Sequence, residues 1–111
     1  MKGTNIGEFE EVVLLTIASL MTEAYSVNIV DEIKEVTGRA TKLGVVHSVL
    51  NRLEDKGMIS SDLGDPTKER GGRRKRFYQV THAGKVALIK SKEQRDRLWG
   101  SIPDVVFDGI K

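Results

Sequence analysis

The chain of 111 residues contains no cysteine, and aromatic residues make up only 5% of it. The absence of cysteine excludes disulfide scaffolds, cysteine-ligated zinc and thiol catalysis, and it suits an intracellular environment. The longest nearly apolar run, Val12–Met21, is too short to span a bilayer, so we expect no membrane partner. Glu8, Glu10 and Glu11 interrupt the segment where a signal peptide would be apolar, and none is predicted.

Motifs for catalysis and metal binding are also missing. His47 and His82 lie on separate predicted elements, so they are not placed to act as a catalytic pair. No His-x-x-x-His, Glu-x-x-His or carboxylate cluster has metal-ligand spacing. The glycines from Gly64 to Gly72 lead into a predicted strand, unlike a phosphate-binding loop. We therefore expect no enzyme activity, no catalytic residue, no metal and no cofactor.

Net charge is small as well, at +2, but this sum conceals two halves of opposite sign. Residues 1–64 carry six Lys/Arg against ten Asp/Glu, whereas residues 65–111 carry twelve against six. Six of those twelve cations, with a single anion, fall within the nine residues from Lys68 to Arg76. Such a local concentration of positive charge predicts a polyanionic partner.

Hydrophobic residues recur at helical spacing in three segments of the N-terminal half. The first, Gly7–Met21, is apolar on nearly every side, which is typical of a helix that is central in its core or shares a face with another subunit. We expect the second helix to start from an N-cap at Ser26 and to end at Gly38 in a left-handed turn. Thr41 is the expected N-cap of the third helix, which ends at Gly57.

Strand-like segments follow, with Met58–Leu63 pairing with Arg73–Val80 around a long loop at Gly64–Gly72. Thr81 is placed to cap a last helix that continues to about Gly100. This order predicts a mainly α fold with a two-stranded β wing, a winged helix-turn-helix. We expect a three-helix core and β-hairpin wing in residues 1–81, a C-terminal dimerisation helix in residues 82–100, and an irregular tail in residues 101–111.

In this frame the third helix enters the major groove of double-stranded DNA and the wing contacts the backbone or the minor groove. The predicted contacts of the recognition helix are Thr41, Lys42, Gly44, Val45, His47, Ser48, Asn51 and Arg52. Those of the wing are Lys68, Arg70, Arg73, Arg74, Lys75 and Arg76. A charged ribbon also protects an exposed sheet edge, and polar residues line any amphipathic helix. The alternative hypothesis is therefore a winged-helix protein-interaction or adaptor module without sequence-specific DNA binding.

Four motifs at matching spacing resemble the PadR-like transcriptional regulators. They are IGEFEEVVL at residues 6–14, EAYSV at 23–27, LEDKG at 53–57 and GGRRKRFY at 71–78. The segment LGVVHSVL at residues 43–50 resembles the family's recognition helix, although the family usually has Tyr where this chain has His47. The resemblance implies a cytoplasmic bacterial DNA-binding protein, typically a repressor, that acts as a homodimer through its C-terminal helix.

A homodimer would read a pseudopalindromic operator about one helical turn apart. The last helix has no sustained heptad, so we expect its ends to pack on the surplus apolar face of the first helix rather than to form a coiled coil. The predicted interface residues are Leu14, Leu15, Leu88, Leu98, Trp99 and Ile102. Trp99 is first of all an anchor of that interface; as an alternative, the resemblance implies that it borders a pocket for a planar aromatic or phenolic effector.

Overall fold

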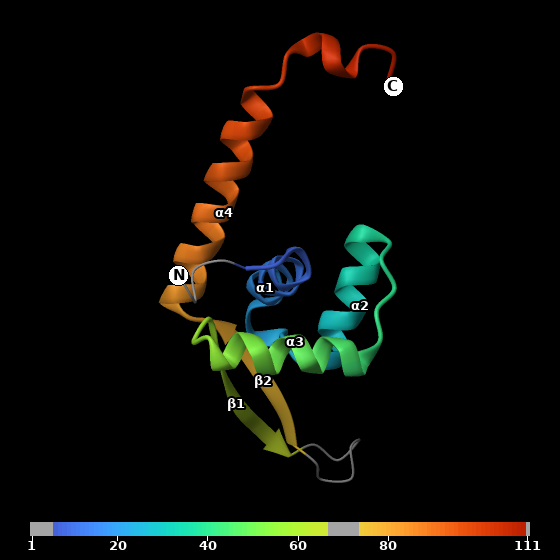
Figure 1. Cartoon of the computed structure of the whole chain (residues 1–111). Helices are drawn as coiled ribbons and strands as arrows, with labels where there is room; N and C mark the ends of the chain where they lie inside the picture. The colour runs from blue at the N-terminus through green and yellow to red at the C-terminus, as the bar shows by residue number, and fades with distance from the viewer. Residues whose placement is uncertain (1–5, 67–73, 111) are drawn as a thin grey trace.

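The computed structural model describes residues 6–66 and 74–110, in which helices and one small sheet alternate as predicted (Figure 1). The helices are α1 (Glu8–Leu20), η1 (Met21–Glu23), α2 (Ser26–Thr37), α3 (Leu43–Asp55), α4 (His82–Gly100) and η3 (Asp104–Phe107), and the strands are β1 (Ile59–Pro66) and β2 (Arg74–Val80). The winged helix-turn-helix fold is thereby confirmed. The division of the chain into residues 1–81, 82–100 and 101–111 stays a prediction.

The core lies where α1, α2 and α3 meet. Each helix turns one apolar face inward, as helical spacing predicts, with Ile17, Ile29 and Leu50 among the fully buried side chains. Leu14 is 0% exposed in this core, whereas its neighbour Leu15 is 52% exposed. The prediction that Leu14 lies at a dimer interface is therefore wrong, because the protomer's own core encloses that side chain.

The ends of the helices follow backbone geometry more closely than side-chain caps. Gly38 and Gly57 adopt left-handed φ angles of 76° at the ends of α2 and α3, as predicted. Thr81 caps α4, as predicted, because its hydroxyl accepts a hydrogen bond of 3.2 Å from the Gly84 N–H. Two predicted caps are wrong. The N-cap of α2 is Tyr25, one residue before Ser26, and the N-cap of α3 is Lys42, one residue after Thr41.

A backbone hydrogen bond explains why α2 starts early. The Tyr78 N–H of β2 donates to the Ala24 carbonyl at 2.8 Å, so the wing holds the chain just before the helix. Tyr25 also pairs with Phe77 as an isolated antiparallel bridge, and their rings meet edge to face at 5.5 Å. The wing is thus joined to the start of α2 as well as to the end of α3.

The wing itself is an antiparallel pair that runs from Ile59 opposite Val80 to Leu63 opposite Arg76, with an irregularity before Pro66. β1 therefore extends three residues beyond its predicted end at Leu63, since residues beyond the irregularity pair again with β2. The predicted contacts Lys68, Arg70 and Arg73 lie outside the residues that the structure describes.

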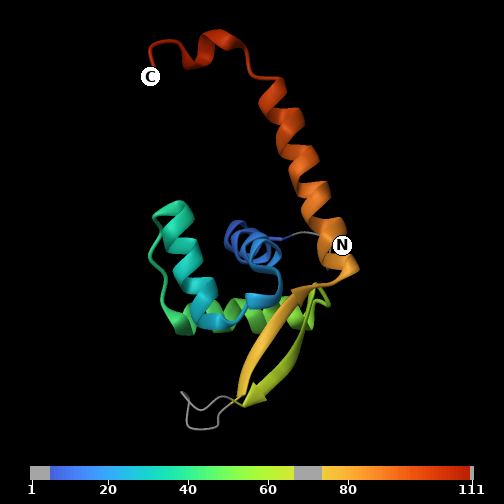
Figure 2. The ribbon, with the colours of Figure 1, turned by 180° about the vertical axis from the view of Figure 1, so that it is seen from behind.

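Helix α4 contacts α1 through its first half and through Arg95, and its outer end then leaves the body of the protein (Figure 2). Ala87 is buried against the core, and the Ser91 hydroxyl donates to Glu11 at 2.9 Å. The radius of gyration is 16.6 Å, against about 13 Å for a compact domain of this length. The tail was predicted to be irregular, but it forms the turn Asp104–Phe107, whose Val106 N–H bonds the Pro103 carbonyl at 3.0 Å.

Candidate nucleic-acid interface

The outward face of α3, the start of α2 and the strand β2 of the wing surround a hollow of about 500 Å³. Its walls carry cationic, hydroxyl, amide and imidazole groups and the carboxylate of Glu54, and they are more polar than apolar. The lining residues are Tyr25, Ser26, Val27, His47, Asn51, Glu54, Arg74, Lys75, Arg76 and Tyr78. The structure therefore brings two groups of predicted contacts, from the helix and from the wing, to one surface.

Helix α3 presents its polar residues outward because its apolar stripe is anchored in the core. Val46, Leu50 and Leu53 are fully buried, which fixes the rotation of the helix about its axis. The predicted contacts Gly44, His47, Ser48 and Asn51 are exposed on the opposite side. A Cβ atom at Gly44 would meet nothing within 4 Å, so packing inside the protomer does not require glycine at this position.

The first predicted contacts of α3 lie around a different hollow. Thr41, Lys42 and Val45 line it together with Phe9, Arg39 and Ala40. Lys42 and Val45 are exposed there, but the Thr41 hydroxyl is buried and has no hydrogen-bond partner among the described residues. Thr41 is thus badly placed for a polar contact across the surface.

Among the residues that the structure describes, no carboxylate forms an ion pair with the wing cations Arg74, Lys75 and Arg76, which are held in place by other contacts. Arg74 Nε donates to the Gly64 carbonyl at 2.7 Å, and Arg76 donates to the Ser61 hydroxyl at 3.0 Å. The Lys75 ammonium lies 4.1 Å from the centroid of the Tyr25 ring, an attractive cation–π geometry. These contacts orient the three side chains while leaving their positive charge available to an anion.

Arg52 differs from the wing cations because it is paired within the protomer. Its Nε donates to Glu10 at 2.9 Å, and Lys56 Nζ donates to both oxygens of the same carboxylate at 3.0 Å. The Gly7 N–H adds a bond of 2.8 Å. Burial raises the pKa of Glu10, but the bonds from Gly7, Lys56 and Arg52 outweigh it, so the pKa is lowered below its ordinary value.

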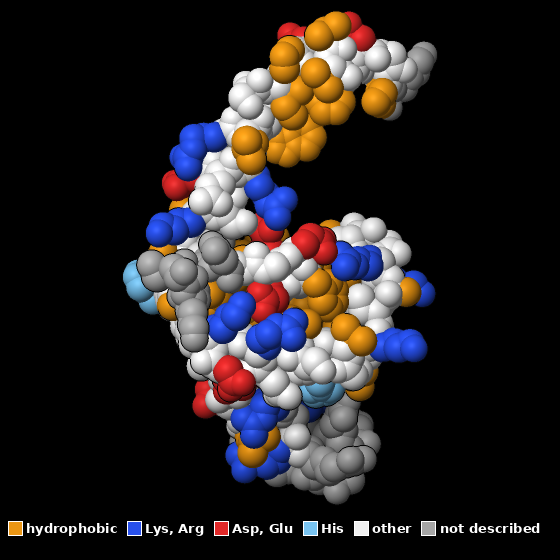
Figure 3. All heavy atoms as spheres, viewed as in Figure 1, with side chains coloured by type: hydrophobic (Ala, Val, Ile, Leu, Met, Phe, Trp, Pro, Cys, Tyr) orange, Lys and Arg blue, Asp and Glu red, His pale blue; other side chains and the backbone are white. Residues whose placement is uncertain are grey.

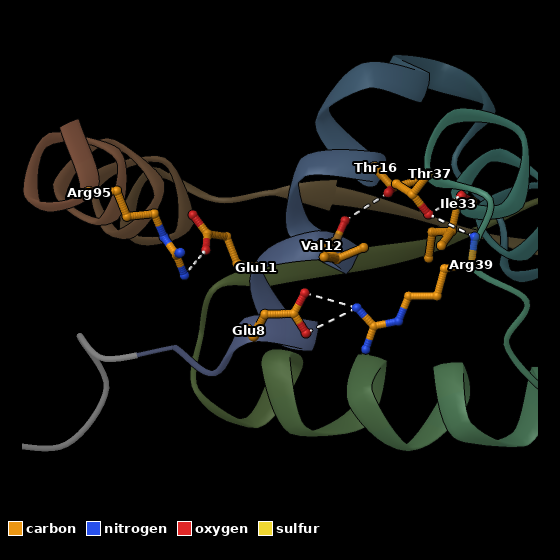
Figure 4. A network of polar contacts seen from close by, with 8 residues as sticks. All are labelled: Glu8, Glu11, Val12, Thr16, Ile33, Thr37, Arg39 and Arg95. Carbon is orange, nitrogen blue, oxygen red and sulfur yellow. Dashed lines mark hydrogen bonds and ion pairs between the residues drawn. The ribbon is translucent and has the colours of Figure 1, made fainter. Parts of the chain in front are cut away.

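Glu10 was not singled out from the sequence, although it is the most buried carboxylate at this surface, at 5% exposure. The available signal was its position three and seven residues before Val13 and Ile17, on the inward face of α1. A charged residue on such a face needs a partner, and here α3 supplies it. Figure 4 shows two neighbouring pairs, Glu8 with Arg39 and Glu11 with Arg95.

Comparisons with known proteins agree with this geometry. The family model described as the transcriptional regulator PadR-like family matches residues 14–90. The chain belongs to the PadR-like family of transcriptional regulators. A comparison with curated protein sequences finds no match.

Solved structures of PadR-like proteins share the fold. The chain is similar to a PadR-like transcription factor from Bacteroides fragilis, with a TM-score of 0.73, 20% identity and 84% of each chain covered. It is also similar to a PadR-like regulator from Bacillus cereus, with a TM-score of 0.72, 16% identity, and 91% of this chain and 92% of that one covered. A PadR family regulator from Clostridium difficile is similar with a TM-score of 0.68 and 22% identity. The match covers 83% of this chain and 92% of that one.

Membership of the PadR-like family makes this chain a DNA-binding transcriptional regulator. In the described part of the chain no group of three His, Cys, Asp or Glu side chains could hold a metal ion. Across the same residues no helix has the length and hydropathy needed to cross a membrane.

The predicted dimer contacts of this PadR-like chain, Leu14 apart, lie on α1, on α4 and just after α4. Leu15 on α1 and Leu98 on α4 are exposed. Leu88 is half-buried against the core, and Ile102 is half-buried just after α4. Trp99 is 64% exposed, and its ring stacks on Phe107 at 5.9 Å.

Proposed function

We propose that this protein is a repressor that binds a pseudopalindromic operator sequence-specifically as a homodimer. The observation that carries the proposal is the convergence of α3 and the cationic wing on one surface. An α-helix fits the major groove, and a cationic ribbon beside it fits the phosphate backbone or the minor groove. From α2 the hollow is lined by Ser26 and Val27, whereas the acidic residues Asp31 and Glu35 lie farther along that helix.

We divide the work of recognition between the two elements. Ser48 and Asn51 are short, exposed and carry both donors and acceptors, which suits contact with base edges. Arg74, Lys75 and Arg76 suit phosphates, which carry no sequence information. Arg52 is held by Glu10, so we assign its remaining guanidinium nitrogens to the DNA backbone rather than to a base.

The homodimer is supported by the shape of the molecule and by its exposed apolar side chains. The second half of α4 extends away from the core, and large apolar residues such as Leu98 and Trp99 are exposed on it. One module of this size contacts a single half-site, whereas two copies related by a two-fold axis read both halves of a pseudopalindrome.

Selection of binding sites from random duplex DNA tests both parts of the proposal. We expect a two-fold symmetric consensus. The double variant Arg74→Ala plus Arg76→Ala should bind the selected site and unrelated sequences more weakly by the same factor. The slope of log K against log salt concentration should become shallower by about 0.9 per lost phosphate contact. Asn51→Ala should instead cost about 1–3 kcal/mol at particular base pairs only. Binding that hardly changes with salt and shows no consensus would favour the adaptor alternative.

A release of the operator by a planar aromatic or phenolic effector is the second element that we propose. The specific observation is the stacked and exposed pair of Trp99 and Phe107, whose flat apolar surfaces suit a flat ligand. Titration with planar aromatic compounds should quench the fluorescence of Trp99, the only tryptophan, and weaken DNA binding in parallel. If no compound changes the emission, Trp99 keeps only its role at the interface.

A further inference from the structure

The last ten described residues form an ordered and largely apolar segment, which we name the hook (residues 101–110). A 3₁₀ turn and the bonds Asp108 N–H to Val105 O and Ile110 N–H to Phe107 O, both 3.2 Å, give it a fixed shape. Its large apolar residues Val105, Val106, Phe107 and Ile110 are all exposed. Figure 3 shows that they continue the apolar surface at the outer end of α4.

The protomer's own fold does not account for this composition. An exposed tail of a monomer is ordinarily polar, and contiguous apolar patches on a protein surface mark sites of interaction. The hook has no buried residue in its 3₁₀ turn, and it is tied back to α4 through the stacking of Phe107 on Trp99. The hook therefore has a defined conformation, but its apolar side chains are exposed.

A second feature offers a place for it. A hollow of about 590 Å³, lined mainly by apolar atoms, lies between the end of α1, strand β2 and the start of α4. Ile17, Ala18, Met21 and Leu88 contribute to its walls, and Lys85 and Asp62 are the charged residues of its lining. The residues of α4 that line the hollow lie near the start of that helix, whereas the hook follows its end, and Figures 1 and 2 show how far apart the two ends of α4 are.

We propose that in the homodimer the hook of each protomer occupies this hollow on its partner. The inference rests on the homodimer proposed above and adds the segment and the seat that hold it together. A two-fold axis perpendicular to α4 sets the two helices antiparallel, so that the end of one helix reaches the start of the other. The hook would then lie against the partner's Ala18 and the partner's Leu88.

Charge supports this arrangement. The charged residues of the hook are Asp104 and Asp108, whereas α4 carries five Lys/Arg against two Asp/Glu. An acidic apolar segment on a basic helix is favourable, and the lining of the hollow offers the cation Lys85 beside the single anion Asp62. A second copy of this chain therefore supplies both the apolar and the electrostatic complement of the hook.

The absence of native cysteine makes a direct test practical, because each engineered thiol is unique. We would mix the Val106→Cys protein with the Ala18→Cys protein and add a short bismaleimide. The matched control replaces Ala18→Cys with Val36→Cys, which is exposed on α2 away from the hollow. We expect a covalent heterodimer from the first mixture and at least about tenfold less from the control. Equal or greater yield from the control would overturn the proposal.

The second measurement is the dimer dissociation constant from sedimentation of the full chain. Val105→Ser plus Val106→Ser should raise it at least about tenfold, because the apolar contact is lost. Val36→Ser should leave it unchanged, and both variants should keep the wild-type circular dichroism, since these side chains are exposed. If the wild type is a dimer and the double variant has the same dissociation constant, the role of the hook is refuted but the homodimer is not. If the wild type is a monomer, both proposals are refuted.

Discussion

Replacing Glu10 with Gln tests whether the buried carboxylate holds α1 to α3. The substitution keeps the size of the side chain and an oxygen that can accept the Gly7 N–H, but it removes the negative charge. Arg52 and Lys56, each within 3.0 Å of the carboxylate, then lose their ion pairs with this residue. We expect the folded state to lose stability without losing its fold.

The size of the loss follows from how exposed the partners are. A hydrogen bond to a charged group contributes about 1.5–3 kcal/mol, whereas exposed ion pairs contribute about 0–1 kcal/mol. Here Glu10 is buried, but the side chains of Arg52 and Lys56 are 54% and 28% exposed, so water screens part of the attraction. We therefore expect Glu10→Gln to lower the free energy of unfolding by about 1–2 kcal/mol at pH 7.

Urea denaturation at fixed protein concentration, repeated from pH 7 to pH 3, measures this loss. Because the pKa of Glu10 is lowered on folding, its stabilisation is complete above the unfolded value of about 4.3 and is lost as the pH falls through the folded value. The wild type and Glu10→Gln should differ most at pH 7 and converge below about pH 4.3.

Glu8→Gln is the matched control, because Glu8 pairs with Arg39 at 2.9 Å but both side chains are largely exposed. It should cost no more than about 1 kcal/mol. Equal losses in the two variants, or a Glu10→Gln loss that stays constant down to pH 3, would refute the reasoning that burial gives Glu10 its importance.

Three further predictions concern stability. Gly84→Ala should destabilise the fold by about 3 kcal/mol, because its Cβ would clash with the Met58 carbonyl and lie 2.7 Å from Val80 Cγ1. Gly100→Ala, which has open space around it, is the control in the same thermal denaturation experiment. Met21→Gly should raise the free energy of unfolding by about 1 kcal/mol, since Met21 has a φ of 54° and is exposed; an unchanged value in urea would show that this backbone is not strained. Burial raises the pKa of Tyr78, so its neutral form stabilises the fold below about pH 10 and that contribution is lost above it; alkaline titration of Tyr78→Phe should show a weaker loss than the wild type.

The parts of the fold that local chemistry decides could be predicted from the sequence. Gly38 and Gly57 end their helices because each adopts a left-handed φ, and Thr81 caps α4 with its own hydroxyl. The 3.6-residue period of Val46, Leu50 and Leu53 gave the orientation of α3, and with it the exposure of Ser48 and Asn51.

Features set by distant partners could not be predicted in this way. The wing fixes the start of α2 through the bond between Tyr78 and Ala24, so Ser26 was assigned as a cap that the chain does not use. Leu14 and Leu15 are both leucines in a helix that is apolar on nearly every side. Only the rotation of α1 about its axis decides that Leu14 is buried and Leu15 is exposed. The pairing of Arg52 with Glu10 could not be predicted either, because the two residues are 42 positions apart in the sequence.

The acidic N-terminal half and the cationic wing have complementary roles in the structure. The first turn of α1 offers three carboxylates, and each takes cations from a different element: Glu8 from the segment between α2 and α3, Glu10 from α3, and Glu11 from α4. The acidic residues thus neutralise the positive charges that join the helices. On β2, by contrast, Arg74, Lys75 and Arg76 contact a carbonyl, an aromatic ring and a hydroxyl. These cations of the other elements are thus paired with carboxylates of α1, whereas those of β2 keep a positive charge that can attract a phosphate backbone.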